Sequence, residues 1–161
     1  MSSFRVLLAD NDHDNLKTNA EFLRLMGYEV VTTETPDETI TLLEEEWVHV
    51  AVLDMRLSLN EDEKDRSGLQ IAMKNAPAVP KLILTAFPTF QDVAEAMRPT
   101  RRSLPPVINY LSKQESDLND LAKAVDEALA EHVGLNQALQ IDWRCVSSAQ
   151  LVNLLEPTLS S

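Results

Sequence analysis

Side chains that could do chemistry follow four short apolar runs of this sequence. They are Asp10, Asn11, Asp12, Asp54, Thr85 and Lys113. Clustered carboxylates repel one another, so they are stable together only with a cation or with raised pKa values. Hard oxygen ligands, in a chain with one cysteine and no paired histidines, suit Mg²⁺. Such an ion would neutralise charge on a phosphoryl group. A lysine and a threonine could bind the oxygens of that phosphoryl group. The residue types therefore indicate a carboxylate site that accepts a phosphoryl group.

An alternation of strands and helices must bring these residues together. Apolar or β-branched runs predict strands at 6–9, 28–33, 48–53, 82–84 and 107–111. Helical spacing or helix-start signals predict helices near 13–26, 36–46, 67–76, 90–97 and 118–129. Strict alternation favours a parallel sheet covered on both faces, an α/β fold. In such a sheet the functional site lies beyond the carboxyl ends of the strands, where the candidate residues stand.

Two local signals mark helix ends in the first half of the chain. Gly27 stands where a glycine commonly ends a helix. Thr35-Pro36-Asp37-Glu38 reads as a capping box with proline at the first helical position. The segments 58–66 and 98–106 are rich in charges and prolines and are expected to be surface loops.

Length and charge limit the classes of protein to consider. The chain has 161 residues, enough for one ordinary domain, which we place at 1–132. It has 14 Lys and Arg against 26 Asp and Glu, which argues against direct DNA binding through phosphate neutralisation. A long apolar run and a signal pattern are both missing, so we expect a cytoplasmic protein without membrane contact.

The C-terminal extension, 133–161, is too apolar for a free linker. Three arrangements remain open for it. It packs on the main domain, it pairs with a second copy in a homodimer, or it is the stub of a longer protein.

Five short motifs together resemble the response-regulator receiver domain of two-component signalling, of the chemotaxis-receiver type. They are 6–12, 50–57, 67–69, 83–86 and 110–113, which contain respectively Asp10, Asp54, Gly68, Thr85 and Lys113. The resemblance covers roughly residues 4 to 132. It implies a doubly wound, five-stranded parallel sheet of order 2-1-3-4-5, the flavodoxin-like receiver fold.

The resemblance also implies roles for single residues. Asp54 would accept a phosphoryl group from a histidine kinase. Asp10, Asn11, Asp54 and the backbone carbonyl of Arg56 would hold Mg²⁺, with Asp12 a further candidate if its side chain turns inward. Lys113 would pair with Asp54 and then with the phosphate. Thr85 would hydrogen-bond the phosphate, and Tyr110 would move inward and so switch a downstream protein partner. The chain would act as a signalling receiver and not as an enzyme on other substrates.

The sequence departs from the family pattern at several places. Asn11 replaces the second acid of the usual pair and removes one negative charge. Gln114 stands where a proline usually follows the lysine, so a cis bond is not expected there. The segments after Asp54 and between Thr85 and Lys113 are longer than usual.

These departures motivate two alternatives. One is a degenerate receiver, an interaction module that is never phosphorylated, which Asn11 and Gln114 favour. The other is a phosphatase of the haloacid-dehalogenase type, with Asp10 as nucleophile and Asp12 as general acid. Asp54 would have no role in such an enzyme, and the chain has no convincing late acidic pair after Lys113.

Overall fold

A computed structural model describes residues 3–58, 62–86, 89–98 and 105–133. The predicted C-terminal extension lies outside the described residues except for Val133, and so does most of the predicted loop 98–106. Among the helices in the described part of the chain, none combines the length and the apolar character needed to cross a membrane.

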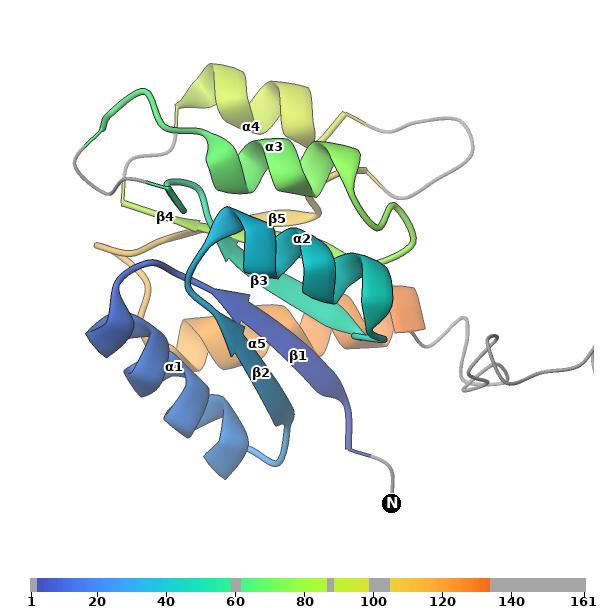
Figure 1. Ribbon diagram of the computed structural model, residues 1–161. Helices are drawn as coiled ribbons and strands as arrows, with labels where there is room; N and C mark the ends of the chain where they lie inside the picture. The colour runs from blue at the N-terminus through green and yellow to red at the C-terminus, as the bar shows by residue number, and fades with distance from the viewer. Residues whose placement is uncertain (1–2, 59–61, 87–88, 99–104, 134–161) are drawn as a thin grey trace, which may run out of the picture.

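The chain alternates strictly between strand and helix, as the sequence predicts (Figure 1). The strands are β1 (Arg5–Ala9), β2 (Glu29–Thr33), β3 (Val50–Asp54), β4 (Lys81–Thr85) and β5 (Asn109–Ser112). The helices are α1 (His13–Leu25), α2 (Pro36–Glu45), α3 (Ser67–Lys74), α4 (Phe90–Ala96) and α5 (Leu118–Ala128), which continues into a π-helical turn, Leu129–Val133. All strands are parallel, in the order β2-β1-β3-β4-β5, which confirms the expected fold.

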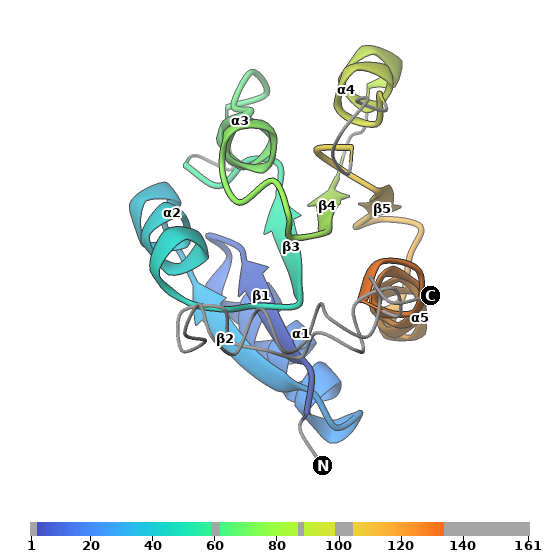
Figure 2. The ribbon, with the colours of Figure 1, turned by 90° about the vertical axis from the view of Figure 1, so that its right-hand side faces the viewer.

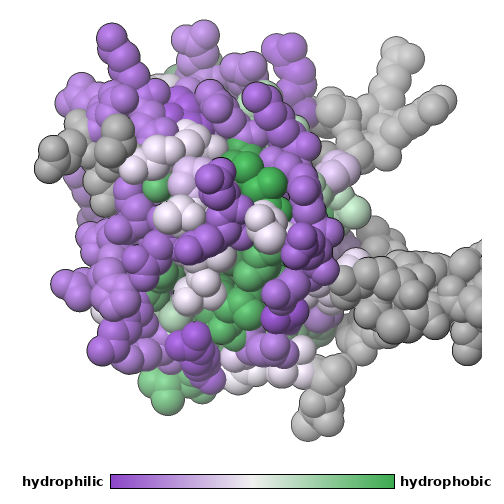
Figure 3. Space-filling view, in the orientation of Figure 1, coloured by the Kyte–Doolittle hydropathy of each residue, from purple (hydrophilic) through white to green (hydrophobic). Residues whose placement is uncertain are grey.

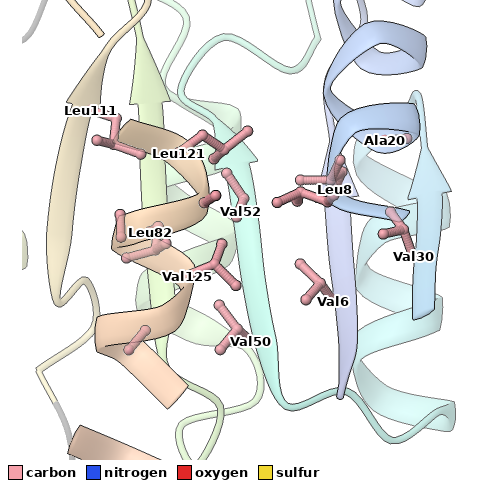
Figure 4. Packing of buried hydrophobic residues seen from close by; sticks show 14 of the residues in the cluster. Val6, Leu8, Ala20, Val30, Val50, Val52, Leu82, Leu111, Leu121 and Val125 are labelled. Atoms are coloured by element: carbon pink, nitrogen blue, oxygen red, sulfur yellow. The ribbon is translucent and has the colours of Figure 1, made fainter. Parts of the chain in front are cut away.

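Helices cover both faces of the sheet and bury two hydrophobic clusters. Figure 2 shows α1 and α5 on one side of the sheet and α2 and α3 on the other. Because side chains alternate along a strand, Val6 and Leu8 face the α1 and α5 side, where Val125 of α5 packs among them (Figure 4). Leu7 and Ala9 face the opposite cluster. The central strand β3 is buried along its whole length, which explains its continuous apolar run.

Side-chain caps fix where the helices begin. Asp12 accepts hydrogen bonds from the backbone nitrogens of Asp14 and Asn15 at the start of α1. Thr35 accepts from the Glu38 nitrogen at the start of α2, as predicted. The predicted capping box is incomplete, however, because the Glu38 carboxylate accepts from Glu34 N and not from Thr35 N. Gly27 follows α1 with a φ of 99°, a conformation that favours glycine.

Strand boundaries differ from the expectations where buried apolar residues precede a strand but are not part of it. Val107 is fully buried, but its nitrogen donates to the carbonyl of Ala96, so β5 begins only at Asn109. Val48 is likewise buried ahead of β3. The third helix ends at Lys74 instead of near Ala76, which adopts a φ of 45° that a helix does not allow.

A buried lysine at the start of β4 departs from the expected apolar strand. Lys81 is 1% exposed, and its Nζ donates to the carbonyls of Ala76 and Val79 at 2.6 and 3.2 Å. Burial lowers the pKa of Lys81 to about 8. The ammonium therefore holds the turn between α3 and β4, at the end of β4 opposite Thr85.

The outer surface is mostly hydrophilic on one face of the molecule. On the face shown in Figure 3, hydrophilic residues predominate, and hydrophobic residues form small patches between them. Such scattered patches are normal for the surface of a globular domain.

Candidate functional site

Four strand ends bring the candidate side chains to one edge of the sheet. Asp10 follows β1, Asp54 ends β3, Thr85 ends β4, and Lys113 follows β5. Backbone hydrogen bonds hold these ends in register, with the nitrogen of Lys113 donating to the carbonyl of Thr85 at 2.8 Å. The edge chosen from the sequence is therefore the place where these residues meet.

Lys113 bridges the two carboxylates at this edge. Its Nζ lies 2.9 Å from Oδ2 of Asp10 and 3.0 Å from Oδ2 of Asp54. Both aspartates are 4% exposed, so the three groups form a compact, nearly buried ionic cluster. Lys113 reaches them although Gln114 replaces the usual proline, and no cis peptide bond occurs in the described ranges.

Burial and neighbouring charges set the protonation of the cluster. Burial raises the pKa of Asp54 to about 6, because the Lys113 ammonium offsets only part of the loss of solvation and the Asp10 carboxylate adds to the shift. Burial alone would lower the pKa of Lys113, but the carboxylates of Asp54 and Asp10 outweigh it and raise that pKa. Near neutral pH, Lys113 is therefore charged, and Asp54 is mostly ionised and available as a nucleophile.

The oxygen atoms at this edge suit a hard cation, although few of them belong to acidic side chains. In the described part of the chain, no three His, Cys, Asp or Glu side chains are grouped as metal ligands. Asn11 stands where the family pattern has a second acid. The Oδ1 atom of Asn11 is buried, and none of the described residues donates a hydrogen bond to it. Asn11 directly follows Asp10 in the chain, and an unpartnered amide oxygen is a ligand that suits Mg²⁺. The residues present therefore fit the ion.

Asp12 points its carboxylate toward α1. Its Oδ1 accepts from the nitrogens of Asp14 and Asn15, both at 3.1 Å. The carboxylate of Asp12 therefore caps the start of α1. Its backbone nitrogen still contacts the site, because it donates to Oδ1 of Asp10 at 2.9 Å.

The two candidate switch residues lie on β4 and β5. Thr85 is 1% exposed, and its hydroxyl lies 3.8 Å from the sulfur of Met55. The hydroxyl of Tyr110 donates to the carbonyl of Asp92 in α4 at 3.2 Å. Burial and the nearby Asp92 charge raise the pKa of Tyr110 to about 12, so this hydroxyl keeps its proton at neutral pH.

The segment after Asp54 is held close to the site by Ser67 and Gly68. The Ser67 hydroxyl accepts from the nitrogens of Leu57 and Ser58, and the Gly68 nitrogen donates to the carbonyl of Met55 at 3.0 Å. A Cβ at position 68 would lie 1.7 Å from the carbonyl oxygen of Asp54. Only glycine therefore allows α3 to begin against the end of β3.

Two contacts near the site involve residues that the sequence patterns do not indicate. Asn15 donates from Nδ2 to Oδ2 of Asp10 at 2.5 Å. Arg66 pairs its Nε with Oδ2 of Asp92 at 3.0 Å, so the loop predicted to be only solvated is joined to α4. Both come from loop or helix positions that no strand-end rule identifies. Because Asp12 caps α1, Asn15 is the third residue of that helix, and an aspartate at such a helix start is the signal that could indicate this contact.

The comparisons with known proteins agree with this geometry. The model of the response regulator receiver domain matches residues 6–126. The transcriptional regulatory protein GlrR of Escherichia coli K12 is 33% identical over 129 residues, which are 78% of this chain and 26% of that protein. The chain thus spans about a quarter of the length of the curated relatives it matches.

Solved structures support the fold. A CheY-like receiver domain protein from Methanospirillum hungatei JF-1 matches with a TM-score of 0.69 and 23% identity, covering 83% of this chain and 99% of that one. The chemotaxis response regulator CheY4 of Vibrio cholerae matches with a TM-score of 0.61 and 18% identity, covering 80% of this chain and 100% of that one. At these identities the similarity supports the fold alone.

Proposed function

Because this chain belongs to the response-regulator receiver family, we propose that it is a phosphorylation-activated receiver whose phosphoacceptor is Asp54. The single observation that carries the proposal is the Lys113 ammonium, which lies within 3.0 Å of both Asp10 and Asp54 at the end of the sheet. A nucleophilic carboxylate next to a compact positive charge is suited to receive a phosphoryl group.

In the proposed reaction, a carboxylate oxygen of Asp54 forms a bond to phosphorus while the phosphorus–nitrogen bond of a kinase phosphohistidine breaks. The electron pair of that bond returns to the imidazole, which leaves, and Asp54 becomes an acyl phosphate. Lys113 then turns from the carboxylates to the phosphoryl oxygens. Mg²⁺, held by Asp10, Asn11, Asp54 and the carbonyl of Arg56, would neutralise charge on the transferring group.

The phosphoryl group would then bias a switch between two conformations. The hydroxyl of Thr85 donates to a phosphoryl oxygen, and Tyr110 moves into the space that Thr85 leaves. Because Tyr110 contacts Asp92 of α4, its movement alters the surface that α4 presents. A downstream protein partner would read this surface, as phosphorylation switches generally work by biasing an existing equilibrium.

The phosphatase alternative has little support. It requires Asp12 as a general acid, whereas the carboxylate of Asp12 is engaged in capping α1. The degenerate receiver differs from the main proposal only in lacking phosphorylation, so the same experiment decides between them.

The proposal is tested by intact-mass spectrometry after incubation with acetyl phosphate, with and without Mg²⁺, beside an Asp54→Asn variant. We expect a phosphate adduct on the wild type with Mg²⁺ and none on the variant. If the wild type forms no adduct and also fails to bind beryllofluoride in the presence of Mg²⁺, the proposal is wrong and the degenerate receiver is favoured.

A further inference from the structure

Asn15 contacts the site from α1, outside the residues given a role above. It is the third residue of that helix, and its Nδ2 lies 2.5 Å from Oδ2 of Asp10. The position follows from the helix start, because Oδ1 of Asp12 accepts from the backbone nitrogen of Asn15 at 3.1 Å. The cap that begins α1 therefore also carries an amide donor to Asp10.

The carboxylate of Asp10 has several donors in the unphosphorylated protein. The nitrogen of Asp12 donates to Oδ1 at 2.9 Å, while Asn15 and Lys113 both contact Oδ2. Asp10 is 4% exposed, so little water can replace a donor that leaves. A buried carboxylate oxygen without a donor is costly, since the group was desolvated to enter the protein.

The proposed reaction takes one of these donors away. Lys113 is shared between Asp10 and Asp54, and it turns to the phosphoryl group once Asp54 is modified. At that point Asn15 is the side chain still donating to Oδ2 of Asp10 among the contacts described above, and its amide would keep that carboxylate oriented as a ligand of the proposed Mg²⁺ ion.

We propose that Asn15 is a positioning residue that keeps the Asp10 carboxylate hydrogen-bonded and oriented while Lys113 moves to the phosphoryl group. This inference rests on the proposed function. It predicts that Asn15 matters more in the phosphorylated state than in the unphosphorylated one, where Lys113 also serves Oδ2. The residue acts through Asp10, the carboxylate to which its amide donates.

The test compares Asn15→Leu with the wild type in beryllofluoride binding, measured by calorimetry at saturating Mg²⁺. Leucine has a similar size and no donor, and an open groove between α1 and α5, about 280 Å³ in volume, adjoins position 15. We expect affinity for beryllofluoride to fall about tenfold, the effect of removing one hydrogen bond to a buried charge. The midpoint of thermal unfolding without ligands is expected to change little.

Two further variants separate positioning from a general structural effect. Thr18→Val is the matched control, because Thr18 lines the same groove and donates only to the carbonyl of Asp14 among the contacts described. It is expected to bind beryllofluoride like the wild type. Asn15→Gln keeps an amide that can reach Asp10, so it is expected to recover part of the lost affinity.

The outcomes distinguish this inference from the function on which it rests. If the wild type binds beryllofluoride and Asn15→Leu binds it within twofold as tightly, the role of Asn15 is refuted while the receiver function stands. An equal loss of affinity in Thr18→Val would also refute it. If the wild type does not bind beryllofluoride, the proposed function itself fails.

Discussion

Burial makes Asp54 harder to ionise than an exposed aspartate. Its pKa rises from 3.8 to about 6, because loss of solvation exceeds the attraction of Lys113. Ionised Asp54 is therefore held at a cost in stability, which is consistent with its proposed role, since a nucleophile must be ionised to react. Because of this cost, the free energy of unfolding depends on pH through the ionisation of Asp54.

Replacing Asp54 by Asn is expected to stabilise the metal-free protein at neutral pH. A folded-state pKa above the unfolded value means that the protonated form favours folding. This contribution is complete below about pH 4 and is lost as pH rises through 6. A rise of the pKa from 3.8 to about 6 corresponds to roughly 3 kcal/mol at pH 7 as an upper bound.

Urea unfolding in EDTA from pH 4 to 7.5 measures this effect. The free energy of unfolding of Asp54→Asn relative to the wild type should rise with pH across the range. A difference that stays constant, or that falls as pH rises, would show that Asp54 is not destabilised by ionisation.

Some site residues could be predicted from the sequence and others could not, for a physical reason. Asp10, Asp54, Thr85 and Lys113 follow apolar runs, and parallel strands bring such positions to one edge. Asn15 lies on a helix, and its hydrogen bond to Asp10 depends on the direction in which α1 starts from that edge of the sheet. The burial of Lys81 depends on carbonyls of the turn before it, which no apolar pattern reveals.

At the scale of elements, the start of α3 is set by its approach to β3. A Cβ on residue 68 would lie 1.7 Å from the carbonyl oxygen and 2.8 Å from the carbonyl carbon of Asp54, both backbone atoms that cannot turn aside. Helix and strand must separate to admit it.

Gly68→Ala is therefore expected to lower the free energy of unfolding by about 1–3 kcal/mol and to slow phosphorylation of Asp54, whose backbone must shift. Gln70→Ala, on the exposed side of the same helix, is the control and should leave both unchanged. Chemical denaturation and the rate of adduct formation with acetyl phosphate provide the measurements. Wild-type values for Gly68→Ala would mean that α3 is not held against Asp54.

A cluster around Asp92 joins three elements next to the site. Arg66 pairs with the Asp92 carboxylate from the loop after β3, and Thr89 donates to the same oxygen at 2.5 Å. Tyr110 of β5 donates to the Asp92 carbonyl. The longer loop after Asp54 thus restrains α4, although charge and composition predict only a solvated segment there.

Arg66→Met is expected to loosen α4 while leaving the sheet intact. The ion pair is partly exposed, so its contribution is at most about 1 kcal/mol, which corresponds to roughly fivefold faster amide hydrogen exchange in α4. Lys123→Met, which removes an exposed charge from α5, should leave exchange in α4 unchanged. Unchanged exchange in Arg66→Met would show that the loop does not restrain this helix.

At the scale of the whole molecule, the sheet separates two hydrophobic clusters and gathers the reactive groups at one end. The alternation of strands and helices predicts an α/β fold, because each strand must be followed by a helical crossover. Alternation alone does not decide the strand order, which was expected only through the family resemblance and is confirmed here. The arrangement of the C-terminal extension stays a prediction.

Asp54, among the acids at this edge, is the residue that we propose carries the phosphoryl group. Borohydride reduces an acyl phosphate to an alcohol, so the modified aspartate is converted to homoserine. Trypsin cleavage after Arg24 and Arg56 releases residues 25–56 with Asp54, whereas residues 6–17 contain Asp10 and Asp12. The most direct measurement is peptide mass spectrometry after acetyl phosphate, Mg²⁺ and borohydride. We predict homoserine at position 54. Homoserine at position 10 or 12, with residue 54 unmodified, would contradict the account.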